Sequence, residues 1–124
     1  MTQQTPQKVA LVTGASSGIG EAIARRFAAE GYRVLTAQRR PSPVGETIAL
    51  SLLDADAVDR LSAEVVARAG RLDVLVNNAG VMLEGTVQES SLADWDTQMQ
   101  LNLTVPFALS RALMALLPAS QGNI

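Results

Sequence analysis

The sequence predicts an α/β fold in which helices cover both faces of a doubly wound parallel sheet. Short apolar segments alternate along the chain with longer segments whose apolar residues recur at helical spacing. The first apolar segment also ends in a glycine-rich loop, as a buried parallel strand does before its crossover helix. The chain has 124 residues, 48% of them hydrophobic, which is enough for one core. We therefore expect a single domain over residues 1–124.

The first β–α–β unit is expected within the first 37 residues. Residues 9–13 (VALVT) are apolar up to their terminal threonine and predict a buried strand. A helix follows the glycine loop, since apolar residues recur there at helical spacing and Gly31 stands where a helix commonly ends. Residues 33–37 (RVLTA) predict the second strand, which completes the unit.

The same alternation continues through the remaining residues. Residues 47–52 predict a third strand, residues 56–70 a helix and residues 72–78 a fourth strand. The segment RRPSPVGE contains two prolines and a glycine, which is typical of a loop between the second and third strands. A long helix, straight or kinked, is expected from residue 92 to residue 117.

Composition excludes several classes of function. The net charge of −2 gives no electrostatic basis for binding nucleic acid. The chain has neither cysteine nor histidine, which excludes disulfides, thiolate chemistry, zinc sites built on those residues and an imidazole base, and we expect no metal. The opening residues lack an apolar signal segment, and the longest apolar run is broken by polar residues and a proline, so we expect a cytoplasmic protein without a membrane span.

The stretch VTGASSGIGEA is the first candidate site. A pyrophosphate binds at a helix N-terminus when residues without a Cβ let the backbone come close, and Gly14, Gly18 and Gly20 can meet that need. The hydroxyls of Ser16 and Ser17 can donate to phosphate or cap the helix. The alternative interpretation is a plain strand-to-helix turn.

The end of the second strand bears on the choice of cofactor. In a dinucleotide-binding fold, a carboxylate here accepts a hydrogen bond from the ribose 2′-hydroxyl and repels a 2′-phosphate. This chain has Gln38, followed by Arg39 and Arg40, whose guanidinium groups suit a phosphate. The sequence therefore favours NADP(H) over NAD(H), with Arg39 the stronger candidate. The alternative is that both arginines are simply solvated.

Pro106 points to Asn102 as a second candidate site. Proline has no N–H, so the carbonyl of Asn102, four residues earlier, loses its helical hydrogen-bond partner. Such a carbonyl must find another donor, often a water molecule. The alternative is a proline kink that only shapes packing, and Trp95, before this helix, is expected to be a packing residue.

Three motifs together resemble the short-chain dehydrogenase/reductase family of the classical type: TGASSGIG at 13–20, NNAG at 77–80 and LNLTVPF at 101–107. The resemblance implies a Rossmann-type sheet with strand order 3-2-1-4 and hydride transfer between a nicotinamide and an alcohol or carbonyl. It implies a catalytic role for Asn102, whose main-chain carbonyl would hold a water in a proton relay. It also implies a set of cofactor-binding residues: Gly14, Ser16, Ser17, Gly18, Ile19, Gly20, Arg39, Arg40, Asp54, Asn78, Ala79 and Gly80.

Two members of that set carry specific expectations. Asp54, taken to lie at the end of strand three, resembles the family acid that contacts adenine. Asn78 resembles part of the strand-four wall against the cofactor ribose, although asparagines at a strand end also fix neighbouring loops through backbone hydrogen bonds. The long helix implies a homo-oligomer, a dimer or tetramer, because it commonly forms a dimer interface in relatives.

The family's catalytic Tyr-x-x-x-Lys pair has no counterpart among these residues. The only tyrosine is Tyr32, and the only lysine, Lys8, precedes it. We expect residues 1–124 to be the cofactor-binding half of an oxidoreductase, with strand five onward missing and the 124-residue chain inactive alone. The alternatives are a module that binds a dinucleotide without chemistry and a structural fragment whose strand-four edge another chain completes.

Overall fold

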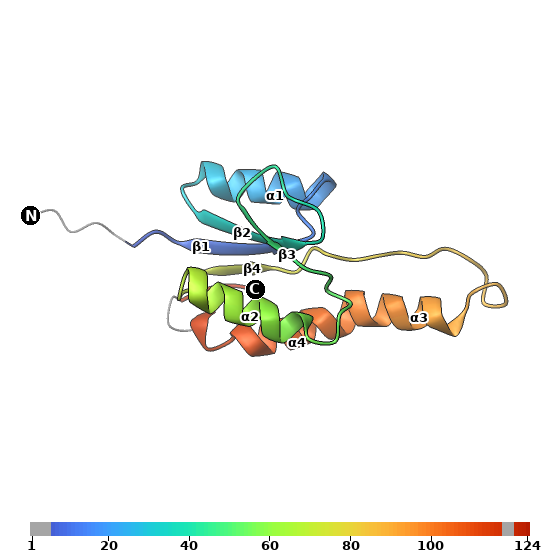
Figure 1. Ribbon diagram of the computed structural model, residues 1–124. Helices are drawn as coiled ribbons and strands as arrows, with labels where there is room; N and C mark the ends of the chain where they lie inside the picture. The colour runs from blue at the N-terminus through green and yellow to red at the C-terminus, as the bar shows by residue number, and fades with distance from the viewer. Residues whose placement is uncertain (1–5, 118–120) are drawn as a thin grey trace, which may run out of the picture.

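The computed structural model describes residues 6–117 and 121–124. Its four strands form one parallel sheet in the order β3-β2-β1-β4 (Figure 1). The strands are β1 Val9–Thr13, β2 Arg33–Gln38, β3 Glu46–Ala49 and β4 Val74–Val76. The parallel sheet and the strand order predicted from the sequence are confirmed.

β1 lies in the middle of the sheet, and all five of its residues are buried. Ala10 is in register with Val34 on β2 and with Val74 on β4. A strand with a neighbour on each edge and a helical layer on each face has no side exposed to water, which explains why the run VALVT does not alternate with polar residues.

Helices cover both faces of the sheet. α1 (Gly18–Ala29) lies on one face, and α2 (Ala57–Arg68) and α4 (Val105–Leu113) lie on the other (Figure 1). Leucines from three strands and two of the helices form the larger core, on the α2 and α4 side: Leu11, Leu35, Leu61, Leu75 and Leu109. Full burial of each such side chain stabilises the fold by about 1.5–3 kcal/mol. None of the helices in the described residues is long and apolar enough to cross a membrane.

β3 is shorter than the sequence suggests. It ends at Ala49 rather than at residue 52, and a turn follows in which the N–H of Asp54 donates to the carbonyl of Ser51 (3.1 Å). Leu50 and Leu52 are nevertheless buried, so their apolar character reflects burial after the strand rather than strand structure.

The predicted long helix is three elements. α3 (Leu92–Met99) is followed by η1, a π-helix over Gln100–Thr104, and then by α4, which ends at Leu113. The N–H of Val105 donates to the carbonyl of Gln100, five residues back. Since Pro106 has no N–H to continue the regular ladder, the chain widens by one residue before it. The kink is therefore a π-helical turn.

The outer edge of β4 is partly occupied by the last residues of the chain. Asn123 forms a parallel bridge with Val74, and its carbonyl accepts from the N–H of Leu75 (2.9 Å). The N–H of Asn123 donates to the carbonyl of Asp73 (2.8 Å). Residues 122–124 thus lie where a fifth parallel strand would begin.

Candidate functional site

The candidate site lies at the carboxyl ends of the four strands. The glycine loop follows β1, residues 39 and 40 follow β2, residues 50–53 follow β3, and residues 77–80 follow β4. In an open parallel α/β sheet, this edge forms the crevice in which ligands bind. The fold therefore gathers most of the predicted site residues at one edge, although they are far apart in the sequence.

The glycine loop comes as close to its neighbours as a bare backbone allows. Gly14 and Gly18 have φ angles of +69° and +60°, which favour glycine. A Cβ on Gly20 would lie 2.0 Å from the carbonyl oxygen of Gly14 and 2.5 Å from Nδ2 of Asn78. The loop delivers the N-terminus of α1, whose N-cap residue Ser17 makes no side-chain capping bond. Exposed donors at this N-terminus are therefore available to an anion.

Thr13 joins the glycine loop to the end of β4. Its hydroxyl oxygen accepts from the N–H groups of Asn78 (3.1 Å) and Ala79 (3.0 Å), and Asn78 donates in turn from Nδ2 to the carbonyl of Gly14 (3.0 Å). Asn77 donates to the hydroxyl of Ser110 (3.4 Å). The loop-fixing interpretation therefore holds for Asn78, whereas the Asn77 amide contacts a side chain on α4. Thr13 opens the motif TGASSGIG, but these contacts of its hydroxyl were not predicted, because Asn78 and Ala79 are distant from it in the sequence.

Gln38 and Ser42 hold the glycine loop from the other side. The side-chain oxygen of Gln38 accepts from the N–H of Ala15 (3.0 Å), and its amide donates to the hydroxyl of Thr36 (3.1 Å). The Ser42 hydroxyl donates to the carbonyl of Ala15 (2.8 Å). Both polar groups of Ala15 are thereby satisfied, and the Gln38 side chain is turned into the protein. Sequence reasoning treated Gln38 only as an absent carboxylate and did not find this contact.

Arg39 and Arg40 are exposed and take part in none of the ion pairs found among the described residues. With Ser16 and Gln38 they line an open pocket of about 530 Å³ beside the glycine loop. Among the described residues, two guanidinium groups without a carboxylate partner thus line this pocket, and their donors suit a phosphate.

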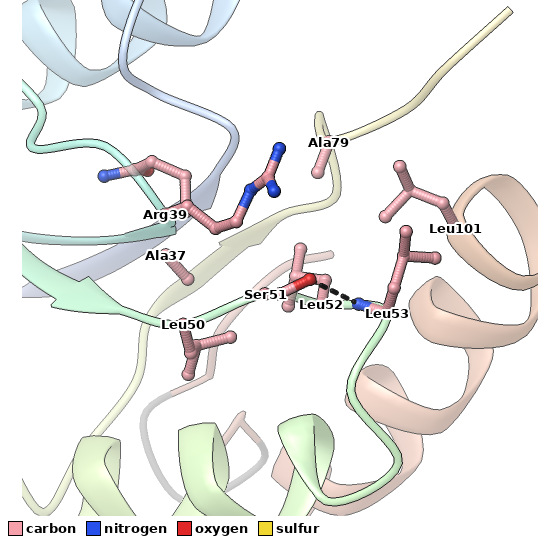
Figure 2. Close-up of a pocket in the computed structure, with 9 residues that line it drawn as sticks. Ala37, Arg39, Leu50, Ser51, Leu52, Leu53, Ala79 and Leu101 are labelled. Atoms are coloured by element: carbon pink, nitrogen blue, oxygen red, sulfur yellow. Dashed lines mark hydrogen bonds between the residues drawn. The ribbon is translucent and has the colours of Figure 1, made fainter. Parts of the chain in front are cut away.

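A second pocket lies beyond Arg39, between the ends of β2, β3 and β4. It measures about 190 Å³, and Figure 2 shows the Arg39 side chain extending over it toward Ala79. Apolar side chains dominate its lining, which comprises Ala37, Gln38, Arg39, Leu50, Ser51, Leu52, Leu53, Ala79 and Leu101. Its apolar lining suits an aromatic ring.

The structure corrects the position expected for Asp54. This residue follows the end of β3 by five positions, is exposed, lies 3.7 Å from Arg60 (Oδ2 to Nη1), and does not line the pocket. Its carbonyl accepts from the N–H of Ala57, at the start of α2. The turn at residues 51–54 carries Asp54 away from the sheet edge, and Ser51 lies at the pocket instead.

The exposed side chain of Asn102 contacts the segment after β4. Its Oδ1 accepts from the N–H of Val81 (2.8 Å), and its Nδ2 donates to the carbonyl of Val81 (2.7 Å). A Cβ on Gly80 would lie 3.0 Å from Oδ1 of Asn102, so the close approach depends on that glycine. The side chain of Asn102 thus connects η1 to the strand-four wall of the site.

Tyr32 and Lys8 lie at the other end of the sheet. Tyr32 precedes β2 and packs edge-on against Phe27, with ring centroids 5.0 Å apart. Lys8 precedes β1 and is exposed. Within the described residues, no group of three or more acidic side chains is placed to hold a metal ion.

Comparison with known proteins gives a consistent result. The protein-family model described as short chain dehydrogenase matches residues 8–124 of this chain. The meso-2,3-butanediol dehydrogenase of Serratia marcescens is 41% identical over 99 residues, which cover 71% of this chain and 39% of that protein. A 3-oxoacyl-[acyl-carrier-protein] reductase of Synechocystis is 38% identical over 94% of this chain and 53% of its own length. The chain thus spans about half the length of the curated relatives it matches.

Solved structures agree with the fold. A short-chain dehydrogenase from Streptomyces avermitilis superposes with a TM-score of 0.87 and 35% identity, over 97% of this chain and 48% of that one. A metagenomic short-chain oxidoreductase in complex with NADP gives 0.84 and 36%, over 94% and 59%. An oxidoreductase from Brucella ovis with a partially ordered NAD gives 0.82 and 34%, over 94% and 60%.

Proposed function

The chain belongs to the short-chain dehydrogenase family, and we propose that it is the cofactor-binding part of an NADP(H)-dependent oxidoreductase acting on an alcohol or carbonyl substrate. The observation that carries this proposal is the glycine loop. Gly20 leaves no room for a Cβ, and the loop presents the N-terminus of α1 beside two unpaired arginines. These residues fit a dinucleotide pyrophosphate with an extra phosphate nearby.

The preference for NADP(H) rests on residues 38–40. Gln38 is neutral, and its amide is bonded inward to Ala15 and Thr36, so it brings no negative charge to the ribose. Among the described residues, Arg39 and Arg40 have no carboxylate partner, and they can serve a 2′-phosphate. Solved relatives carry either cofactor, so this preference comes from the chain's own residues.

When bound, the cofactor supplies hydride chemistry at its nicotinamide ring. The chain's part is to bind and orient: the Gly14–Gly20 loop holds the pyrophosphate, while Asn78, Ala79 and Gly80 form the wall beside it. The side chain of Asn102 is hydrogen-bonded to the backbone of Val81. The proton-relay role that we propose for Asn102 therefore belongs to its main-chain carbonyl within η1. Because Tyr32 and Lys8 lie at the far end of the sheet, we expect residues 1–124 alone to bind cofactor without turnover.

The proposal includes a homo-oligomer and a cytoplasmic location. Support for the oligomer comes from exposed apolar side chains along α3, η1 and α4, on the opposite side from the buried Leu109 and Leu113. The protein partner in this proposal is a second copy of this chain, and the substrate is a small molecule.

Titration of the chain with NADP⁺ and with NAD⁺, followed by calorimetry, tests the proposal. We expect NADP⁺ to bind more tightly, and Arg39→Ala to weaken NADP⁺ at least about tenfold, or about 1.4 kcal/mol, with little effect on NAD⁺. Arg26→Ala is the matched control, since Arg26 is an exposed arginine at the far end of α1. Equal affinity for the two cofactors would refute the NADP(H) preference, and binding of neither would refute the proposed function.

A further inference from the structure

The apolar pocket beyond Arg39 contains a single hydroxyl. Ser51 supplies it, and none of the described residues lining the pocket carries a carboxylate (Figure 2). The other polar side chains are Gln38, whose amide is bonded to Ala15 and Thr36, and Arg39, which can only donate. Ser51 is therefore the one lining side chain free to match either a donor or an acceptor on a ligand.

The hydrogen bond that Ser51 makes leaves its proton available. The N–H of Leu53 donates to the Ser51 hydroxyl oxygen (3.3 Å), and Asp54 N–H donates to the Ser51 carbonyl (3.1 Å), so a tight turn fixes the residue at the pocket. A hydroxyl that accepts one bond within the protein still has a donor and a second lone pair. Ser51 can thus rotate its proton toward the ligand or away from it.

The position of the pocket relative to the glycine loop identifies what it would hold. The pyrophosphate cradle follows β1, the arginine pocket follows β2, and the apolar pocket lies beside them at the same edge, between the ends of β2, β3 and β4. A dinucleotide extended along this edge places its purine in the apolar pocket. This step rests on the proposed function.

We propose that Ser51 determines the purine preference of the site, and that its hydroxyl lets the pocket accept a 6-oxopurine as well as adenine. Adenine presents an amino donor at position 6 and an acceptor at N1, while hypoxanthine presents an acceptor at position 6 and a donor at N1. A hydroxyl complements either pattern, whereas a carboxylate only accepts and would repel a 6-oxo group. The donors of Arg39 at the pocket mouth also suit a 6-oxo group.

The test compares NADP⁺ with nicotinamide hypoxanthine dinucleotide phosphate, which differs only in the purine. The ratio of the two dissociation constants cancels every effect on the phosphates and the nicotinamide. We expect wild type to bind the two within about tenfold of each other, and Ser51→Asp to increase the preference for NADP⁺ by about tenfold more. An aspartate can still accept from the N–H of Leu53, so the turn should persist.

Ser51→Ala is the matched control, because it removes the hydroxyl without adding charge. We expect it to weaken both dinucleotides by similar factors and to leave their ratio near that of wild type. The proposal is overturned if wild type rejects the hypoxanthine dinucleotide by more than about thirtyfold, or if Ser51→Asp leaves the ratio unchanged. Wild type that binds neither dinucleotide would refute the proposed function itself, and the base preference with it.

Discussion

Asp73 is the only charged residue that is buried within residues 6–117 and 121–124. Its Oδ2 accepts from the N–H of Val9 (2.8 Å), and both of its oxygens accept from Arg71 (2.8 and 3.0 Å). Burial by itself raises the pKa of the carboxyl, but the hydrogen bonds from Arg71 and Val9 outweigh it and hold the pKa below the ordinary 3.8. This side chain therefore ties the start of β4 to the start of β1.

Asp73→Asn should destabilise the fold by about 1–3 kcal/mol, because the charge-assisted bonds from Arg71 are lost. Since the native pKa is depressed, the contribution of Asp73 is complete above its unfolded pKa and disappears as the pH falls through the native value. Urea unfolding of both proteins between pH 7 and pH 3 measures the difference. A gap in unfolding free energy that widens toward low pH would contradict this assignment.

Among the elements, η1 has the most direct bearing on the site. The π-helical turn before Pro106 places Asn102 against Val81, where it makes both a donated and an accepted hydrogen bond. π-helical turns often occur at functional sites, where they redirect one side chain of a regular helix. Here the redirected residue holds the segment after β4, which forms one wall of the candidate cofactor site.

Asn102→Ala should release this segment. We expect hydrogen exchange at the amide of Val81 to accelerate by about tenfold or more, since its acceptor is removed. Asn102→Asp provides a graded control: it keeps an acceptor for the Val81 N–H and loses the donor to the Val81 carbonyl, so its exchange rate should be intermediate. Unchanged exchange at Val81 in the alanine variant would show that the segment is held by other contacts.

For the whole molecule, the main unexplained surface is apolar. Four apolar side chains along α3, η1 and α4 are between 49% and 67% exposed: Trp95, Leu103, Phe107 and Met114. Val105, Leu109 and Leu113, on the other side of α4, are buried in the core. A second copy of the chain is the partner we propose for this exposed surface, which would remove the apolar area from water.

The chain should accordingly sediment above its monomer mass of 13.1 kDa, and Phe107→Glu should return it to that mass, because a buried unpaired carboxylate is unfavourable at a contact. Val66→Glu is the matched control, since Val66 is 55% exposed on a different helix, α2, and should leave the assembly intact. Wild type that sediments at 13.1 kDa across micromolar concentrations would contradict the oligomer.

The sequence by itself determined the alternation of strands and helices along the chain and the glycine loop. Strand and helix periodicity is local, so β1 and a parallel sheet covered by helices followed from the pattern of the chain. The order β3-β2-β1-β4 was implied by the resemblance to a family and is confirmed. The roles of the three loop glycines were also predictable from the sequence, because backbone conformation and close approach restrict the residue type at Gly14, Gly18 and Gly20. Pro106 marked the helix distortion, although its π-helical form was not foreseen.

Only the tertiary structure decided which side chains meet at the site. Thr13 contacts Asn78 across 65 residues and Gln38 contacts Ala15 across 23, and no local pattern records such pairs. Ser51, and not the expected Asp54, lines the pocket because of where β3 ends. The end of β3 is set by the turn at residues 51–54 and by pairing with β2. Local sequence fixes the conformation of a segment, whereas the neighbours of its side chains are fixed by the packing of distant segments against one another.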